Sequence, residues 1–379
     1  MRSAKISIIM PVYNCERFLD NTLSMLTEQS FSDFELIAID DGSTDSSLTI
    51  LKQWELNDPR IVVFSQKNQG AGAARNKGLS EAKGDYLLFL DSDDLFEPNL
   101  LERAFSTAIE SNADIVIYGA DFYYEDSATF KQVPWLSLDR LPNKEVFDFL
   151  EINYPNRFRS TNGWTWDKLF KHSFVIKQDI RFQSLRTYND MLFTYSLLAL
   201  AERISVCHEI LIHQRKNHKT SLSQTSHKSW WCVYEAVTEL RKTLIDRGLY
   251  SQLEKDFNNY IVHIFEFTLN SVLYTEQITD LYPAMKSWLA TLQPPLDDKY
   301  YYNENEYRWF RRFSDSNCED YLARELILEH NRYLNSEAEL HKERTKRTTA
   351  VNDVKRSNSY RIGRAVTYLP RLIKRLAKS

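Results

Sequence analysis

The fold of this chain is decided by a short stretch, residues 85–94, which reads DYLLFLDSDD. Residues 87–90 are apolar without interruption. Such a run is typical of a strand buried on both faces, because a strand with one wet face would alternate apolar and polar residues. Three aspartates follow at once, Asp91, Asp93 and Asp94. The stretch therefore predicts a strand of a parallel sheet with an acidic cluster at its carboxyl end.

Strand-like and helix-like segments alternate on both sides of this stretch. Apolar runs predict strands at residues 5–10, 34–39, 60–64, 85–90 and 114–118. Helical spacing of apolar residues predicts helices at residues 18–29, 46–56, 71–82 and 98–110. Strict alternation of this kind indicates an α/β fold, in which a mostly parallel sheet is covered by helices on both faces.

The pattern changes after about residue 120. A helix at 191–201 and a strand at 204–212 precede a mostly helical region at 230–292. Residues 294–307 have the composition of a linker. A charged helix is then expected, in which Leu326, Tyr333 and Leu340 lie seven apart, a spacing found in coiled coils. We therefore predict four parts: a nucleotide-binding and catalytic part, a helical region, a linker with a charged helix, and a tail, at residues 1–228, 229–298, 299–356 and 357–379.

The composition is that of a globular protein. Of 379 residues, 43% are hydrophobic and 26% are charged, which excludes a mostly disordered chain or a collagen-like fibre. The four cysteines lie far apart without a CxxC pair, which argues against a zinc or dithiol site. The first apolar run stops at Pro11, and no run reaches the length of a membrane span. We therefore expect a soluble, cytoplasmic chain.

Charge is divided unevenly along the chain. Residues 342–379 carry 12 Lys and Arg against 2 Asp and Glu, whereas the rest of the chain carries 36 against 50. Apolar and basic residues alternate at roughly helical spacing after Tyr360. This pattern favours a helix that lies on an anionic membrane surface, and the alternative is a solvated basic terminus. Nucleic acid is not expected as a partner, because the acidic body would repel phosphates.

Polar clusters follow the predicted strands. They stand at residues 11–14, 40–45, 68–76 and 91–94, and a later cluster stands at 188–190. Because ligands of open parallel sheets bind outside the carboxyl ends of the strands, the first four clusters should share one crevice.

Asp91 and Asp93 have the spacing of a cation site. Carboxylates at positions i and i+2 of an extended strand end point to the same side, so both can reach one ion. An all-oxygen ligand set selects Mg²⁺ or Mn²⁺, which takes further ligands from substrate phosphates. The alternative is an acidic turn in which Asp94 caps the helix that starts near Pro98.

The segment 70–75, GAGAAR, has part of a dinucleotide-binding pattern. The third glycine position holds Arg75, and the segment follows the third strand instead of the first, so NAD binding is rejected. No P-loop sequence exists either. Small residues would let a helix N-terminus approach a ligand, and Arg75 would add a positive charge for a phosphate or for the acidic cluster. The alternative is a tightly packed helix start.

Taken together, these clusters resemble glycosyltransferase family 2, a group of inverting enzymes with the GT-A fold. The resemblance covers about residues 5–225 and rests on stretches that occur in order: SIIMPVYNCERFLDNTL, FELIAIDDGSTD, NQGAGAARNKGLSEAKGDYLLFLDSDD, WTWDKLFKHSF and YNDMLF. The resemblance implies a nucleotide base, usually uridine, cradled by Pro11, Tyr13 and Asp41, with Arg75 near the nucleotide. It also implies a metal held by Asp91 and Asp93, with Asp91 counted among the nucleotide-sugar contacts as well, and Asp190 as the general base.

One position departs from the family pattern. Asn189 stands where a Glu usually precedes the base, which puts in doubt the contact that this Glu would make. Residues 359–364, SYRIGR, are similar to the C-termini of some bacterial capsule and lipopolysaccharide transferases.

The resemblance leads to a specific functional expectation. The chain would be a metal-dependent inverting glycosyltransferase that moves a sugar from a nucleotide diphosphate, UDP in the first instance, to a glycan or lipid-linked acceptor. It would act in bacterial surface-polysaccharide synthesis, peripherally on the inner face of the membrane, and could be a homo-oligomer. The alternatives are a catalytically inactive nucleotide-sugar-binding or scaffold protein and a nucleotidyltransferase.

Three further side chains have two interpretations each. His218 lies in a basic loop that could close over the diphosphate, where it would contact the metal or a phosphate, or it is an ordinary loop histidine. Trp164 and Trp166 could form a platform for a sugar ring, or they pack in the core.

Overall fold

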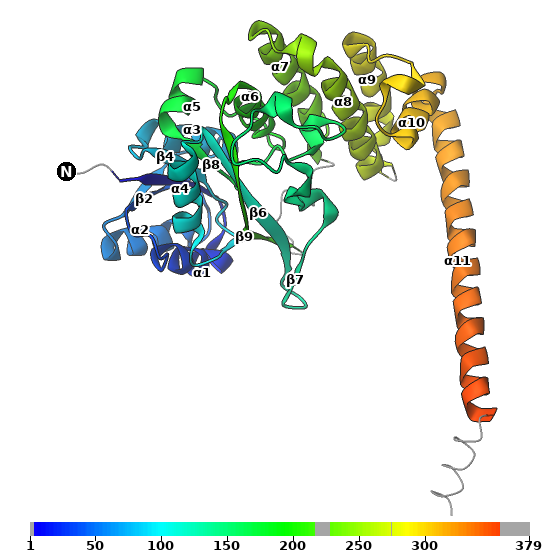
Figure 1. Cartoon of the computed structure of the whole chain (residues 1–379), viewed down its shortest axis with the longest axis horizontal. Coiled ribbons are helices and arrows are strands. Elements are labelled where there is room, and N and C mark those ends of the chain that lie inside the picture. The colour runs from blue at the N-terminus through cyan, green and yellow to red at the C-terminus, as the bar shows by residue number, and fades with distance from the viewer. Residues whose placement is uncertain (1–3, 217–227, 274, 357–379) are drawn as a thin grey trace, which may run out of the picture. The chain divides into compact units, whose positions relative to one another are not determined.

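The computed structural model describes residues 4–216, 228–273 and 275–356. The chain divides into two compact units, residues 1–314 and 315–379. The first unit contains the sheet and most of the helices (Figure 1). His218 and the basic tail lie outside the described residues. The predicted four-part division of the chain stays a prediction.

The first unit is built on one sheet, with strand order β3-β2-β1-β4-β8-β6-β9-β5 and β7 beside β6. Parallel pairs join β1 to β2 and β4, β2 to β3, and β6 to β9. Strand β8 lies antiparallel between β4 and β6. The strands are β1 Ile6–Val12, β2 Phe34–Asp40, β3 Ile61–Ser65, β4 Tyr86–Phe89, β5 Leu95–Phe96, β6 Ile115–Tyr124, β7 Thr129–Lys131, β8 Lys168–Lys171 and β9 Ile204–Lys216.

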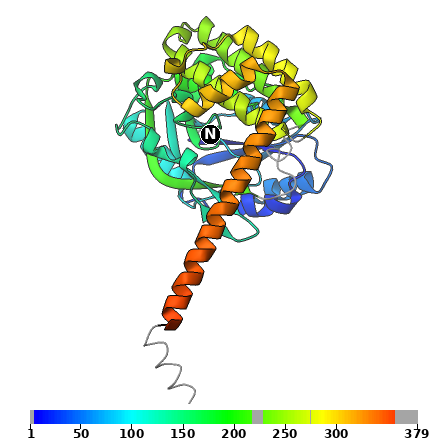
Figure 2. The same cartoon turned by 90° about the vertical axis from the view of Figure 1, so that its right-hand side faces the viewer.

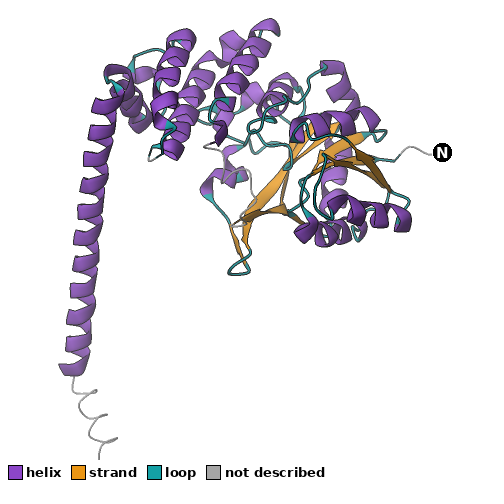
Figure 3. Cartoon of the chain, turned by 180° about the vertical axis from the view of Figure 1, so that it is seen from behind, coloured by secondary structure: helices purple, strands orange, loops and turns teal. Residues whose placement is uncertain are grey.

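Helices cover both faces of this sheet (Figure 3). They are α1 Glu16–Thr27, α2 Ser47–Asn57, α3 Ala71–Glu81, α4 Leu100–Ser111, α5 His172–Gln178 and α6 Met191–Leu200. The alternation of side chains along β1 divides the core in two. Ile8 and Met10 join a large cluster with α1 and α4, whereas Ile9 packs on the opposite face against Gly78 of α3. The predicted α/β fold with both faces covered is confirmed.

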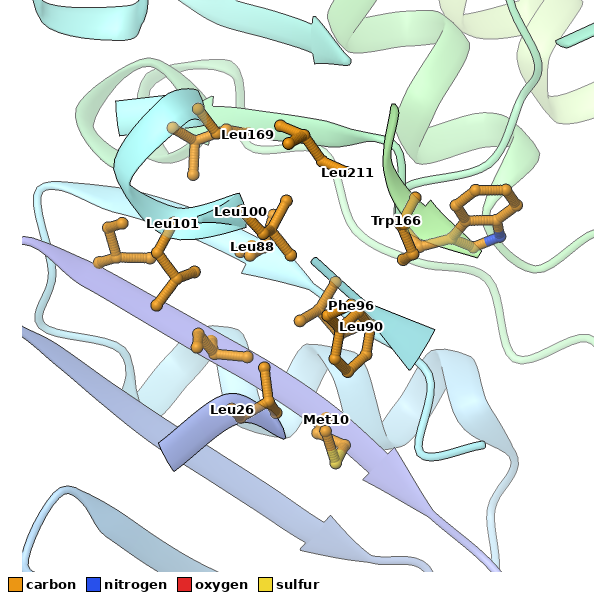
Figure 4. Close-up of a cluster of buried hydrophobic side chains, with 14 of the residues drawn as sticks. Met10, Leu26, Leu88, Leu90, Phe96, Leu100, Leu101, Trp166, Leu169 and Leu211 are labelled. Atoms are coloured by element: carbon orange, nitrogen blue, oxygen red, sulfur yellow. The ribbon is translucent and has the colours of Figure 1, made fainter. Parts of the chain in front are cut away.

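Figure 4 shows part of the larger cluster, in which Met10 and Leu88 of the strands accompany Leu26 of α1 and Leu100 of α4. Trp166 belongs to the same buried cluster, and Trp164 packs against it. The core-packing interpretation therefore holds for Trp166.

A helical region follows the sheet. It consists of α7 Cys232–Asp246, α8 Tyr250–Val272, α9 Ile278–Leu292 and α10 Glu304–Asp315. These helices lie together in two perpendicular views (Figures 1 and 2). Helix α10 begins inside the stretch expected to be a linker, because Trp309, Phe310 and Phe313 give it a buried face. The second unit contains α11, Cys318–Arg356, one continuous helix.

Two expectations from composition meet the structure directly. Within the described ranges, no helix combines the length and apolarity that crossing a membrane requires. All four cysteines are free thiols, as their scattered positions indicated.

Candidate active site

The carboxyl ends of β1 and β2 are tied together at one edge of the sheet. The backbone N–H of Asp41 donates to the carbonyl of Val12 at 2.8 Å. The side chain of Asn14 accepts from the backbone N–H of Thr44 at 2.7 Å. Pro11 is half-buried at the end of β1. Tyr13 follows it with 51% of its surface exposed, so its ring is accessible beside the two strand ends.

Asp41 is buried and its carboxylate organises the loop before α3. One oxygen, Oδ1, accepts from Gln66 Nε2 and from the backbone N–H of Gln69, both at 2.9 Å. The other, Oδ2, accepts from the backbone N–H of Gly70 at 2.7 Å. Asp41 therefore fixes the entry to α3, and its contact with a nucleotide base stays a prediction.

The small residues at the start of α3 serve a close approach. A Cβ at Gly72 would lie 2.1 Å from the carbonyl oxygen of Gln183 and 3.2 Å from Cβ of Asn189. Gly70 has φ +88°, a conformation that favours glycine. Segment 183–189 can therefore lie against α3, which brings the later polar cluster to the strand ends.

Arg75 joins two of the predicted clusters. From α3, its Nη2 donates to Asp91 Oδ1 at 2.6 Å, and its Nη1 donates to Asn189 Oδ1 at 2.8 Å. The guanidinium carbon lies 5.6 Å from the centre of the Phe182 ring, and the side chain is buried. Residues separated by more than a hundred positions in the chain thus meet at one cation, as the topology predicted.

The acidic cluster after β4 carries unbalanced charge. Asp94 Oδ1 accepts from the backbone N–H of Arg215 at 2.9 Å, whereas Asp94 Oδ2 is buried without a partner. Burial raises the pKa of Asp91, and repulsion by Asp93 adds to the rise while Arg75 opposes it. The pKa of Asp94 is raised well above its usual value, first by burial and then by repulsion from Asp93 and Asp91. A bound cation would relieve this repulsion.

These residues fit a cation that substrate helps to hold. The donors are carboxylate oxygens, which suit Mg²⁺ or Mn²⁺. No group of three or more His, Cys, Asp or Glu in the described residues is arranged to hold a metal ion. A cation at Asp91 and Asp93 would therefore need further ligands from elsewhere, such as a diphosphate. The alternative cap role of Asp94 is wrong, because α4 starts at Leu100 with Asn99 as its N-cap.

Asp190 stands at the start of α6, next to the Arg75 bridge. Its backbone carbonyl accepts from the N–H of Thr194 at 2.9 Å. Burial raises the pKa of Asp190 to about 6, partly offset by Arg75. The group can therefore exchange a proton near neutral pH, which is what a general base requires.

Comparison with known proteins agrees with this geometry. A family model described as Glycosyl transferase family 2 matches residues 7–177. The chain is 30% identical to the cholesterol galactosyltransferase of Borreliella burgdorferi over 278 residues, which cover 71% of this chain and 76% of that protein. The chain belongs to glycosyltransferase family 2.

Further comparisons place this glycosyltransferase among bacterial relatives. It is 29% identical over 271 residues to the putative glycosyltransferase EpsH of Bacillus subtilis, covering 69% of this chain and 75% of that protein. The crystal structure of S. aureus TarS 1-349 in complex with UDP-GlcNAc superposes with a TM-score of 0.68 at 21% identity. That match covers 86% of the glycosyltransferase and 92% of the TarS chain, and it confirms the GT-A fold.

A buried ion pair near the base was not foreseen. Lys168 is fully buried, and its Nζ donates to Asp167 Oδ1 at 2.6 Å, to the carbonyl of Trp164 at 2.9 Å and to the carbonyl of Asn162 at 3.0 Å. Lys168 also lowers the pKa of Asp190, though less than Arg75 does. In this glycosyltransferase the pair fixes the loop before β8. A lysine beside apolar strand residues was the signal for it.

Proposed function

We propose that this glycosyltransferase moves a sugar from a UDP-sugar to a hydroxyl of a glycan or lipid-linked acceptor, with inversion at the sugar carbon and with Mn²⁺ or Mg²⁺. One observation carries the proposal: Arg75 holds Asp91 and Asn189 together, so the acidic cluster and the candidate base share one site.

The donor would bind at the joined ends of β1 and β2. The exposed ring of Tyr13 offers a flat face for a base, and Pro11 lies beside it. The TarS structure with UDP-GlcNAc has the same fold and supports a UDP-sugar as donor. Asp41 would act from behind, by fixing the loop that leads into α3.

Asp91 and Asp93 would hold the divalent ion, which supplies charge neutralisation for the departing diphosphate. Arg75 contributes a positive charge that is already fixed by two hydrogen bonds, so little reorganisation is needed as negative charge develops. Arg75 also keeps Asp91 in place through the 2.6 Å ion pair.

Asp190 would take the proton from the acceptor hydroxyl as that oxygen attacks the sugar carbon. A single displacement leaves the nucleotide diphosphate on the opposite face, which inverts the anomeric centre. No covalent intermediate with the protein is required. The bacterial relatives and their names favour an acceptor in a cell-surface glycan or glycolipid.

A thermal-shift panel of UDP-, GDP- and dTDP-sugars with Mn²⁺ tests the donor site. We expect the largest stabilisation with a UDP-sugar, because a ligand that binds the folded state raises its melting temperature. Asp190→Asn should keep this shift but lose sugar transfer and donor hydrolysis. EDTA should abolish both activities in the unmodified protein. Equal turnover by Asp190→Asn would refute the base, and no shift with any nucleotide would refute the donor site.

A further inference from the structure

A second hollow lies away from the strand ends, on the helical side of the first unit. It has a volume of about 330 Å³, within the range of small-molecule sites. Two segments line it: one around the 3₁₀-helix η4, Arg157–Arg159, and one at the start of α10. We call it the 154/302 groove, and its lining residues are Tyr154, Pro155, Asn156, Arg159, Tyr302, Asn303, Glu304 and Glu306.

Polar contacts hold the two walls of the groove in place. Arg159 Nη1 donates to Glu306 Oε1 at 2.6 Å, and His263 Nδ1 lies 3.0 Å from the same oxygen. The backbone N–H of Tyr302 donates to Asn259 Oδ1 at 2.8 Å. The groove is therefore preformed, so a ligand would not have to order it.

Two acceptor atoms at the groove lack a donor. Asn156 is only 2% exposed, yet its Oδ1 has no hydrogen-bond partner. Asn156 also has φ +67°, in the left-handed region. At Glu306, which is 6% exposed, both described contacts go to Oε1, so no described residue donates to Oε2. Buried acceptors are normally satisfied, which makes donors the missing part of this site.

The charge of the groove disfavours an anion. Its one lining cation, Arg159, is already paired with Glu306, and Glu304 is paired with Arg308 outside the lining. A phosphate would meet carboxylates without a free positive charge. A neutral ligand with several hydroxyl donors suits both orphan acceptors.

Two tyrosine rings complete the lining. Tyr302 is 41% exposed, with Lys255 Nζ 4.8 Å from its ring centre. Tyr154 is half-buried, with the Arg140 guanidinium 5.6 Å from its ring centre. Flat apolar faces beside planar polar groups match a sugar ring, which presents C–H faces and hydroxyl edges.

We propose that the 154/302 groove binds a neutral sugar unit of the acceptor. Hydroxyls of that unit donate to Asn156 Oδ1 and Glu306 Oε2, and its C–H face packs on Tyr302. The inference rests on the proposed glycosyl transfer and adds to it a second, separate saccharide site.

The groove connects to the base through one helix. Tyr195 of α6 donates from its hydroxyl to the carbonyl of Phe158 in η4 at 2.6 Å. Asp190 stands five residues earlier, at the start of the same helix. At ~1.5 Å per residue, the two positions differ by about 7 Å along the helix axis. A bound acceptor unit would thus be held by the element that also places the base.

Saturation-transfer NMR on the full chain tests the groove. The probes are methyl α- and β-glycosides of glucose, galactose and N-acetylglucosamine. We expect at least one glycoside to bind the unmodified protein, and Tyr302→Ala to weaken its dissociation constant about tenfold, equivalent to ~1.4 kcal/mol. Tyr302→Phe retains the ring and should bind within about twofold of the unmodified protein. Phe267→Ala removes an exposed aromatic of α8 outside the groove and should bind normally.

Added UDP and Mn²⁺ should leave the glycoside signal unchanged, since the groove is separate from the donor site. Displacement by UDP, no binding of any glycoside, or equal binding by Tyr302→Ala would overturn the proposal. Donor hydrolysis by the unmodified protein is measured in parallel. Hydrolysis without glycoside binding defeats the groove alone, and glycoside binding without hydrolysis defeats the proposed transfer alone.

Discussion

The carboxyl of Asp190 gives the site a defined pH dependence. Its pKa is raised to about 6 mainly by burial, with Asp91 adding repulsion while Arg75 and Lys168 oppose it. The nearby phenols Tyr188, Tyr195 and Tyr260 also face this charge. A base must be ionised, so transfer should fall about tenfold per pH unit below that pKa. The pH profile of kcat measures this, and an acid limb near pH ~4, the pKa of an ordinary Asp, would contradict it.

A matched pair of variants at position 189 isolates the electrostatic cause. Asn189→Glu places a second carboxylate beside Asp190 and pairs Arg75, so it should raise the pKa of Asp190 and move the acid limb to higher pH. Asn189→Gln adds no charge and should leave the limb in place. Equal profiles for the two variants would show that charge at position 189 does not tune the base.

Sequence reasoning located the chemistry at the residue scale but not all of its partners. Asp91 and Asp190 were predicted to share a site, and Arg75 now links their neighbourhoods. The three donors to Asp41 could not be foreseen, because they depend on how the loop before α3 closes. The Lys168 ion pair was missed for the same reason.

At the scale of elements, the packing of α3 against segment 183–189 decides whether the site assembles. Gly72→Ala would drive a methyl group into the Gln183 carbonyl, 2.1 Å away, so either the helix or the segment must move. We expect a loss of ~1–3 kcal/mol in the free energy of unfolding and a large loss of turnover. Urea unfolding and donor hydrolysis measure the two effects.

Ser80→Ala on the same helix provides the control. Ser80 is exposed, and its hydroxyl donates within the helix to Lys77. Its replacement should change stability by less than ~0.5 kcal/mol. If Gly72→Ala behaved like Ser80→Ala, segment 183–189 would not depend on the close approach.

Elements with a clear period were predicted well, and short ones were not. The strands β1 to β4 and helices α1 to α4 lie within two residues of their predicted ends. The antiparallel β8 has four residues and β5 has two, too few to show a period. Helix α10 was hidden because its polar and aromatic composition resembles a linker.

At the scale of the whole molecule, the division of charge bears on location. Residues 357–379 carry six Lys and Arg and no Asp or Glu, whereas the chain before residue 342 has 50 acidic residues against 36 basic ones. An anionic membrane would attract the tail by about 1 kcal/mol per basic residue and repel the body. We therefore propose a peripheral position at an anionic membrane surface.

Deletion of residues 357–379 tests this arrangement. The shortened chain should lose co-sedimentation with phosphatidylserine-containing vesicles and keep donor hydrolysis, because the candidate site residues all lie earlier in the chain. Raising the salt to about 1 M, where the Debye length falls to ~3 Å, should release the unmodified chain as well. Neutral vesicles serve as the control. Sedimentation that survives both the deletion and the salt would show that the acidic body, and not the basic tail, carries the membrane contact.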